Sequence, residues 1–271
     1  MALFKRFRFY LALAVCLTLL LLGAGGQFRL ISFMDKLRRA SPAEHRTRIY
    51  AWSLRWAERL MSVFSDIINF SMAYRLPVRK DQAPPPAIVV VNHRSTFDLM
   101  IVYSALWRMG YCKVRSVAKV ETGRVPVIGR GAIEVGAALV SRSRDPADLE
   151  RIRLCALGAA EDGACVLIFP EGTTYGDAVF QTRSSIAYRN VLPPRFGGVR
   201  TLCQALPDYP VLSLTVDWLD IIGAYDTTRL YSLVGKEMIV EAEYLADVAG
   251  RPVEQWLTEE WLRKDQRLTR T

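Results

Sequence analysis

The sequence predicts an α/β protein in which a mainly parallel or mixed sheet is flanked by helices, with an N-terminal membrane-anchoring helix and a basic amphipathic helix before it. Three observations predict this class. Apolar, β-branched runs alternate with helix-like segments after residue 81, which is typical of strands covered on both faces. Residues 9–26 carry no charge. Residues 1–80 hold 14 basic and 4 acidic side chains, whereas residues 81–271 hold 22 and 23.

This charge distribution limits the functions open to the chain. The formal net charge of +9 lies entirely in the first third, which excludes a generally basic nucleic-acid-binding domain, so we expect no nucleic-acid partner. A composition of 51% hydrophobic and 23% charged residues excludes intrinsic disorder. The five cysteines are scattered without a CxxC pair, so we expect free thiols in a reducing compartment.

The uncharged stretch FYLALAVCLTLLLLGAGG is the predicted membrane anchor, within an N-terminal unit of residues 1–34. Its 18 residues span roughly 27 Å as a helix, enough for a thin bilayer core. Lys5, Arg6 and Arg8 precede it, and a basic flank stays cytoplasmic. We favour an uncleaved anchor, while the small residues 23–26 leave a cleaved signal peptide open. A re-entrant hairpin with both ends cytoplasmic also remains open.

Residues 35–80 form the predicted basic amphipathic segment. Ser41, Pro42 and Glu44 provide a helix N-cap, a first-turn proline and a capping box. Apolar side chains then recur at three- and four-residue spacing from Ile49 to Ile67, interleaved with arginines. Such a helix lies in the lipid headgroup layer or packs on the domain core, and both readings stay open.

The Pro-rich break at residues 81–86 is the predicted start of a catalytic domain that extends to residue 271. Strands are expected at residues 87–91, 114–118, 138–140, 165–169, 210–216 and 236–244. Helices are expected around residues 99–109, 146–161, 199–206 and 253–267.

Two polar clusters follow predicted strands, at residues 92–98 and 170–174. Function in such folds gathers at the carboxyl ends of strands. If His93 lies on a loop before a helix, Asp98 can fold back to hold one ring nitrogen, which leaves the other as a general base. Alternatively, His93 is a hydrogen-bonded structural residue, and Asp98 complements the helix dipole.

The motif Val-x-Asn-His-x-Ser-x-x-Asp, followed about seventy residues later by Phe-Pro-Glu-Gly-Thr, resembles the glycerophospholipid acyltransferases typified by 1-acylglycerol-3-phosphate acyltransferase. The resemblance covers roughly residues 88–216, about half of the chain. Residues 119–129, with Val-Pro-Val-Ile-Gly at 125–129, and residues 136–142 resemble two further segments of that family.

The resemblance implies a membrane-bound enzyme that transfers a fatty acyl group from an acyl-thioester, acyl-CoA or acyl carrier protein, directly to a lysophospholipid hydroxyl. His93 would take the hydroxyl proton and Asp98 would orient the imidazole, without a covalent acyl-enzyme. No bound cofactor and no metal site are expected. The expected substrate-binding residues are Asn92, Ser95, Lys119, Arg142, Glu171, Gly172, Thr173 and Arg195.

The match also has departures. Thr174 stands where many family members carry Arg, which favours an acceptor with less charge than the phosphate monoester of lysophosphatidic acid. Residues 191–198, with Arg195, and a tail with Trp256, Trp261, Lys264 and Asp265 are similar to a subgroup that includes lysocardiolipin and lysophosphatidylglycerol acyltransferases.

Two rival functions remain: a membrane-surface lipid-binding protein without turnover, and an acyl-thioester hydrolase. The expected partners are membrane phospholipid and lysophospholipid. The expected location is the membrane, with the catalytic domain cytoplasmic, in a bacterial inner membrane.

Overall fold

The structure is a computed structural model that describes residues 2–77, 84–95, 97–141, 145–176, 182–183, 187–218 and 231–269. Within these residues, seven strands form one sheet in the order β1-β7-β6-β2-β5-β3-β4. The strands are β1 (Ser71–Arg75), β2 (Ile88–Val91), β3 (Val114–Lys119), β4 (Ala138–Val140), β5 (Cys165–Ile168), β6 (Val211–Asp217) and β7 (Glu237–Leu245).

The sheet is parallel from β6 to β4 and changes direction once. The pairings β6–β2, β2–β5, β5–β3 and β3–β4 are parallel, whereas β7 runs antiparallel to β6 and parallel to β1. Strands β2 and β5 are buried at every position, as expected for strands covered on both faces. Their carboxyl ends lie side by side, because Val90 pairs with Ile168.

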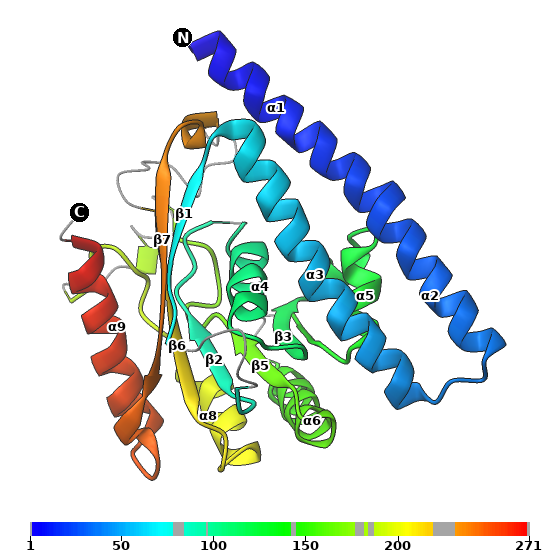
Figure 1. The fold of residues 1–271 in the computed structure, drawn as a ribbon. Coiled ribbons are helices and arrows are strands. Elements are labelled where there is room, and N and C mark those ends of the chain that lie inside the picture. Colours follow the sequence, from blue (N-terminus) through cyan, green and yellow to red (C-terminus); the bar gives the residue numbers. More distant parts are fainter. Residues whose placement is uncertain are drawn as a thin grey trace.

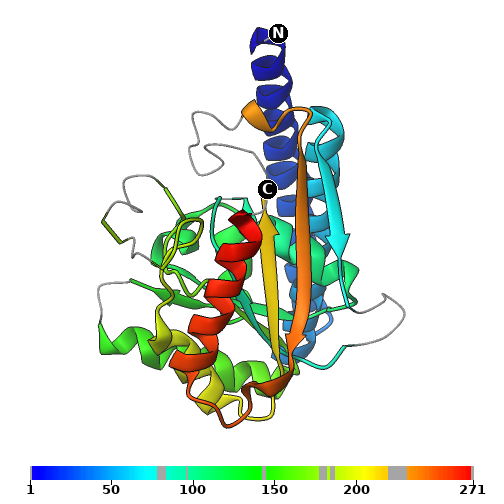
Figure 2. The same ribbon diagram turned by 90° about the vertical axis from the view of Figure 1, so that its left-hand side faces the viewer.

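Helices cover both faces of the sheet. Among the described residues, the structure contains the helical elements α1 (Ala2–Thr18), η1 (Leu19–Ala24), α2 (Gly25–Leu37), α3 (Pro42–Ile68), α4 (Asp98–Arg108), η2 (Val120–Arg124), α5 (Ile128–Glu134), α6 (Pro146–Asp162), α8 (Phe196–Ala205), η4 (Ala246–Val248) and α9 (Val253–Thr269). Helices α3 and α4 pack on one face, and α6, α8 and α9 pack on the other (Figures 1 and 2).

Segments α1, η1 and α2 join into one long helix that lies along α3 and turns back into it at residues 38–41 (Figure 1). Within the described residues, one helix, Leu3–Leu37, is long and apolar enough to cross a membrane by length and composition. Phe9 and Ala12 pack into the same apolar core as Leu54 and Phe64 of α3. The long helix is therefore docked on the domain and not separated from it by a linker.

The structure confirms the α/β class, and each strand and helix predicted after residue 86 lies within a few residues of its observed bounds. The helix predicted at residues 9–26 is longer than expected and extends over residues 2–37. Helix α3 begins with the expected capping box between Ser41 and Glu44. Ten of its residues are buried, including Trp52, so it packs on the core as an ordinary surface helix does. The sequence analysis did not predict β1 or the short helix α5.

The division of the chain at residue 81 stays a prediction, because residues 78–83 lie outside the described part of the chain. The strand before them, β1, nevertheless belongs to the same sheet as the strands after them. The basic segment 35–80 thus supplies both a helix and an edge strand to the α/β fold.

Candidate active site at the carboxyl ends of β2 and β5

The two polar clusters predicted from the sequence meet at one edge of the sheet, because β2 and β5 are parallel neighbours. His93 follows β2, and Glu171 follows β5 by three residues. The backbone N–H of His93 donates to Glu171 Oε1 at 3.1 Å, and the N–H of Tyr175 donates to the His93 carbonyl at 2.7 Å. The strand order alone therefore brings together residues that are 78 positions apart.

His93 lies on the loop before α4, and Asp98 is the first residue of that helix. Asp98 folds back so that its Oδ2 lies 3.0 Å from His93 Nδ1, which is the loop arrangement considered from the sequence. Because a carboxylate accepts and does not donate, the ring proton lies on Nδ1 and Nε2 is the basic nitrogen. Thr174 Oγ1 lies 3.1 Å from Nε2, so its hydroxyl donates to the imidazole.

The Asp98 carboxyl group is completely buried and held on every side. Oδ2 also accepts hydrogen bonds from the backbone N–H groups of Arg94 at 2.6 Å and Ser95 at 2.8 Å. Oδ1 accepts one from Trp218 Nε1 at 3.0 Å. A carboxyl group fixed by several donors holds its imidazole partner in one orientation, as the third member of a catalytic triad does.

An aromatic side chain also packs against the face of the His93 imidazole ring. The Phe169 ring stacks on it with centroids 4.3 Å apart and an interplanar angle of 27°. The sequence analysis missed Phe169 and Trp218 as site residues. The position of Phe169 directly before Pro170 was a local signal, whereas Trp218 follows β6 and its contact with Asp98 depends on tertiary packing.

Glu171 points into the protein and not towards solvent. Its side chain is fully buried, and Oε2 accepts a hydrogen bond from the Leu192 N–H at 3.2 Å while Oε1 takes the His93 N–H. Burial raises the pKa of Glu171 to about 8, and the two backbone hydrogen bonds oppose that rise. Glu171 thus ties the loop after residue 187 to the backbone of the candidate base.

Asn92 and Ser95 are buried and bonded to the protein itself. Asn92 bridges to β6 through two hydrogen bonds, from its Nδ2 to the Val216 carbonyl at 3.0 Å and from the Val216 N–H to its Oδ1 at 2.9 Å. Ser95 Oγ accepts a hydrogen bond from the Phe97 N–H at 3.3 Å. These contacts position the loop that carries His93, and substrate binding by either residue stays a prediction.

The remaining predicted substrate-binding residues lie around the same edge. Gly172 has φ +70° on the turn after β5, and a Cβ there would lie 3.2 Å from Cδ of Arg195, which is exposed. Thr173 follows on that turn. Lys119 is exposed at the end of β3, the neighbour of β5. Arg142 lies outside the described residues.

A largely apolar pocket of about 420 Å³ opens beside the turn after β5. Phe169, Gly172 and Arg195 line one side, and Leu149 and Ile152 of α6 line another. Within the described residues, no group of three or more His, Cys, Asp or Glu side chains is placed to hold a metal ion. The described site therefore offers a fixed imidazole base, a buried carboxyl pair and an adjoining apolar space.

A paired histidine and aspartate after a buried strand, facing a Pro-Glu-Gly turn, forms a site suited to general-base chemistry. A family model for acyltransferases matches residues 75–217, and the chain belongs to that family and carries its acyltransferase domain. The structure is also similar to the crystal structure of the 1-acyl-sn-glycerophosphate (LPA) acyltransferase PlsC from Thermotoga maritima. The two chains are 16% identical with a TM-score of 0.65, over 98% of this chain and 94% of that one. A search of curated proteins found no match.

Proposed function

We propose that this protein is a membrane-bound acyltransferase that moves a fatty acyl group from an acyl-thioester to the free hydroxyl of a lysophospholipid. The observation that carries the proposal is His93, whose Nδ1 is held by Asp98 while Nε2 contacts the Thr174 hydroxyl. An imidazole held in this way takes a proton from a hydroxyl group near neutral pH.

The reaction needs no covalent intermediate on the protein. The acceptor hydroxyl replaces Thr174 at Nε2 and gives up its proton as its oxygen attacks the thioester carbonyl carbon. The C–S bond breaks, and the proton passes from Nε2 to the leaving sulfur. Asp98 keeps the imidazole in the required tautomer and stabilises the charged ring that forms between these two transfers.

For the acceptor we propose a phosphodiester lysolipid, such as lysophosphatidylglycerol or lysocardiolipin, in preference to lysophosphatidic acid. Thr174 occupies the position beside Nε2 at which many similar sequences carry Arg. Arg195, beside Gly172, supplies one exposed guanidinium group at this edge, which suits the single charge of each phosphodiester group in these lipids. Acyl-CoA and acyl carrier protein are both donors compatible with the proposal.

We also propose that the long N-terminal helix lies along the membrane surface. Large apolar side chains are exposed on it, among them Leu22, Leu30 and Phe33. Its other side packs on α3, which packs on α4 and the sheet, so a perpendicular helix would pull the domain into the lipid. Its integration into the core, through Phe9 and Ala12, favours an uncleaved helix. The basic residues Lys5, Arg6 and Arg8 at its start favour the anionic cytoplasmic face of an inner membrane for this helix and the attached site.

The experiment that tests the function uses membranes containing the full chain, labelled acyl-CoA or acyl carrier protein, and three acceptors. These are lysophosphatidic acid, lysophosphatidylglycerol and lysocardiolipin. We expect diacyl product with at least one acceptor, lost on His93→Ala by about 10²–10⁴-fold. Free fatty acid as the only His93-dependent product would indicate a hydrolase, and no His93-dependent product at all would leave a lipid-binding protein.

A further inference from the structure

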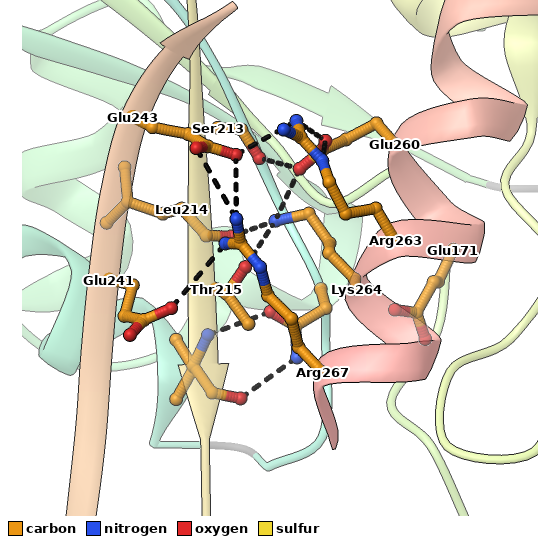
Figure 3. Close-up of polar contacts among 12 residues, drawn as sticks. Glu171, Ser213, Leu214, Thr215, Glu241, Glu243, Glu260, Arg263, Lys264 and Arg267 are labelled. Carbon is orange, nitrogen blue, oxygen red and sulfur yellow. Dashed lines mark hydrogen bonds and ion pairs between the residues drawn. The ribbon is translucent and has the colours of Figure 1, made fainter. Parts of the chain in front are cut away.

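Lys264, on the C-terminal helix α9, is a cation with no exposed surface. Its Nζ donates to the Leu214 carbonyl and, at 3.1 Å, to Thr215 Oγ1, both on β6 (Figure 3). Glu260 Oε1 lies 3.7 Å away. Burial lowers the pKa of Lys264 to about 8, and attraction to Glu260 and Glu171 opposes that change. A buried cation with so few partners carries a large desolvation penalty. The reaction proposed above does not use Lys264.

The strand that Lys264 holds leads directly to the candidate catalytic pair. Val216 follows Thr215 on β6, and both its N–H and its carbonyl are bonded to Asn92, the neighbour of His93. Two residues further on, Trp218 donates to Asp98. Any shift of β6 at Leu214 and Thr215 is therefore transmitted to both His93 and Asp98.

The next residue on α9, Asp265, holds a second support. Its Oδ1 accepts hydrogen bonds from the three consecutive N–H groups of residues 189–191, at 2.8, 2.5 and 3.2 Å. The following N–H, that of Leu192, donates to Glu171 Oε2, and Glu171 Oε1 takes the His93 N–H. This second path runs from Asp265 through the loop and Glu171 to the same histidine.

We infer that Lys264 and Asp265 are positioning residues for acyl transfer: Lys264 fixes β6 beside Asn92 and Trp218, and Asp265 fixes the 189–192 loop that holds Glu171. The inference rests on the proposed function. Neither residue touches the reacting atoms: the Lys264 support reaches Asn92 and Asp98, and the Asp265 support reaches the His93 N–H through Glu171. Displacements of about 1 Å at a catalytic group reduce rates by about 10²-fold, so loosening either support should lower turnover with little effect on substrate affinity.

The test compares kcat and KM of the full-length protein in lipid nanodiscs for wild type, Asp265→Asn, Asp265→Ala and Lys264→Met. Glu259→Gln is the matched control, because Glu259 lies on the same helix and pairs at the surface with Arg251. We expect kcat to fall about tenfold for Asp265→Asn and about 100-fold for Asp265→Ala, with each KM within about threefold of wild type. The asparagine keeps an uncharged acceptor oxygen and thus retains part of the loop's support.

Hydrogen exchange measured on the same samples separates the two supports. Asp265→Asn should speed amide exchange in residues 189–192 and leave residues 213–218 unchanged, and Lys264→Met should do the reverse. If Lys264→Met fails to fold, the graded Asp265 series decides alone. A lowered unfolding temperature with wild-type kcat for folded Asp265→Ala would overturn this inference and leave the proposed function standing. Wild-type protein without His93-dependent acyl transfer would overturn the proposed function itself.

Discussion

The first and last helices of this chain both depart from the usual pattern in which apolar side chains are buried and charged ones are exposed. The N-terminal helix exposes large apolar side chains, with Leu22 at 74% and Phe33 at 63% exposure, whereas α9 buries charged ones, with Lys264 at 0% and Glu260 at 3%. An exposed apolar face is stable only against an apolar environment. A buried charge is stable only with fixed partners. The first helix therefore has an apolar face that suits the proposed lipid surface, and the second depends on the sheet inside the protein.

The largest expected effect comes from breaking the charge network of α9. Glu260 accepts from Ser213 Oγ and pairs with Arg263 and Lys264. Glu260→Ala leaves the Lys264 cation buried without a carboxylate, so the free energy of unfolding should fall by about 3–5 kcal/mol. Thermal unfolding in detergent measures this change. The control is Glu254→Ala, also on α9, which removes a surface pair with Arg200 of α8 and should change stability by less than about 1 kcal/mol. Equal losses for the two variants would contradict the comparison.

Glu171 provides a pH-dependent test of the buried charges. Its pKa is raised by burial to about 8, whereas an unfolded glutamate titrates near 4.3. The folded state thus holds a proton that the unfolded state loses, and this contribution to stability is complete below about pH 4.3 and lost as pH rises through about 8. In the wild type, the free energy of unfolding should therefore fall by on the order of a few kcal/mol between pH 5 and 8, and Glu171→Gln should remove this fall. Unfolding temperatures of both proteins across this range measure it, and parallel curves would refute the assignment.

The N-terminal helix is tested by placing charge on its exposed apolar face. Leu22→Arg should weaken membrane association about tenfold or more, because an arginine within the apolar layer costs up to about 3 kcal/mol. Leu154→Arg is the matched control, since Leu154 is exposed on α6, on the opposite face of the sheet. Vesicle flotation measures the bound fraction. Equal weakening by both variants would show that the long helix does not carry the binding.

The same contrast explains what could be predicted from the sequence. Strands β2 and β5 and their polar ends are predictable because a run of at least four apolar residues precedes each cluster in the sequence, and these residues are buried. Strand β1 was missed because its sequence, SMAYR, is short and mostly half-buried, so it lacks both a continuous apolar run and a clear alternation. The apolar run of the long helix is evident in the sequence, but its packing along α3 could not be predicted from it.

The long-range contacts that hold the site in place could not be predicted from the sequence. Trp218 reaches Asp98 across 120 positions, and Asp265 reaches the 189–191 loop across about 75. Lys264 and Asp265 were noticed only as a similarity of the tail to a subgroup. Their contacts depend on where α9 packs on the sheet, and nothing in local patterning specifies that position.

The smallest expected effect is at the hydroxyl that occupies Nε2 of His93. In the proposed mechanism the acceptor hydroxyl takes the position of Thr174 Oγ1 at Nε2, and a single neutral hydrogen bond contributes about 0.5–1.5 kcal/mol. Thr174→Val removes this competitor while keeping the shape of the side chain, so KM for the lysolipid should fall by up to about tenfold with kcat nearly unchanged. Steady-state kinetics at fixed acyl donor measure it, with Thr173→Val on the same turn as the control. A large fall in kcat for Thr174→Val would show instead that the hydroxyl takes part in the reaction, and Nε2 would then not be the free base that the proposed mechanism requires.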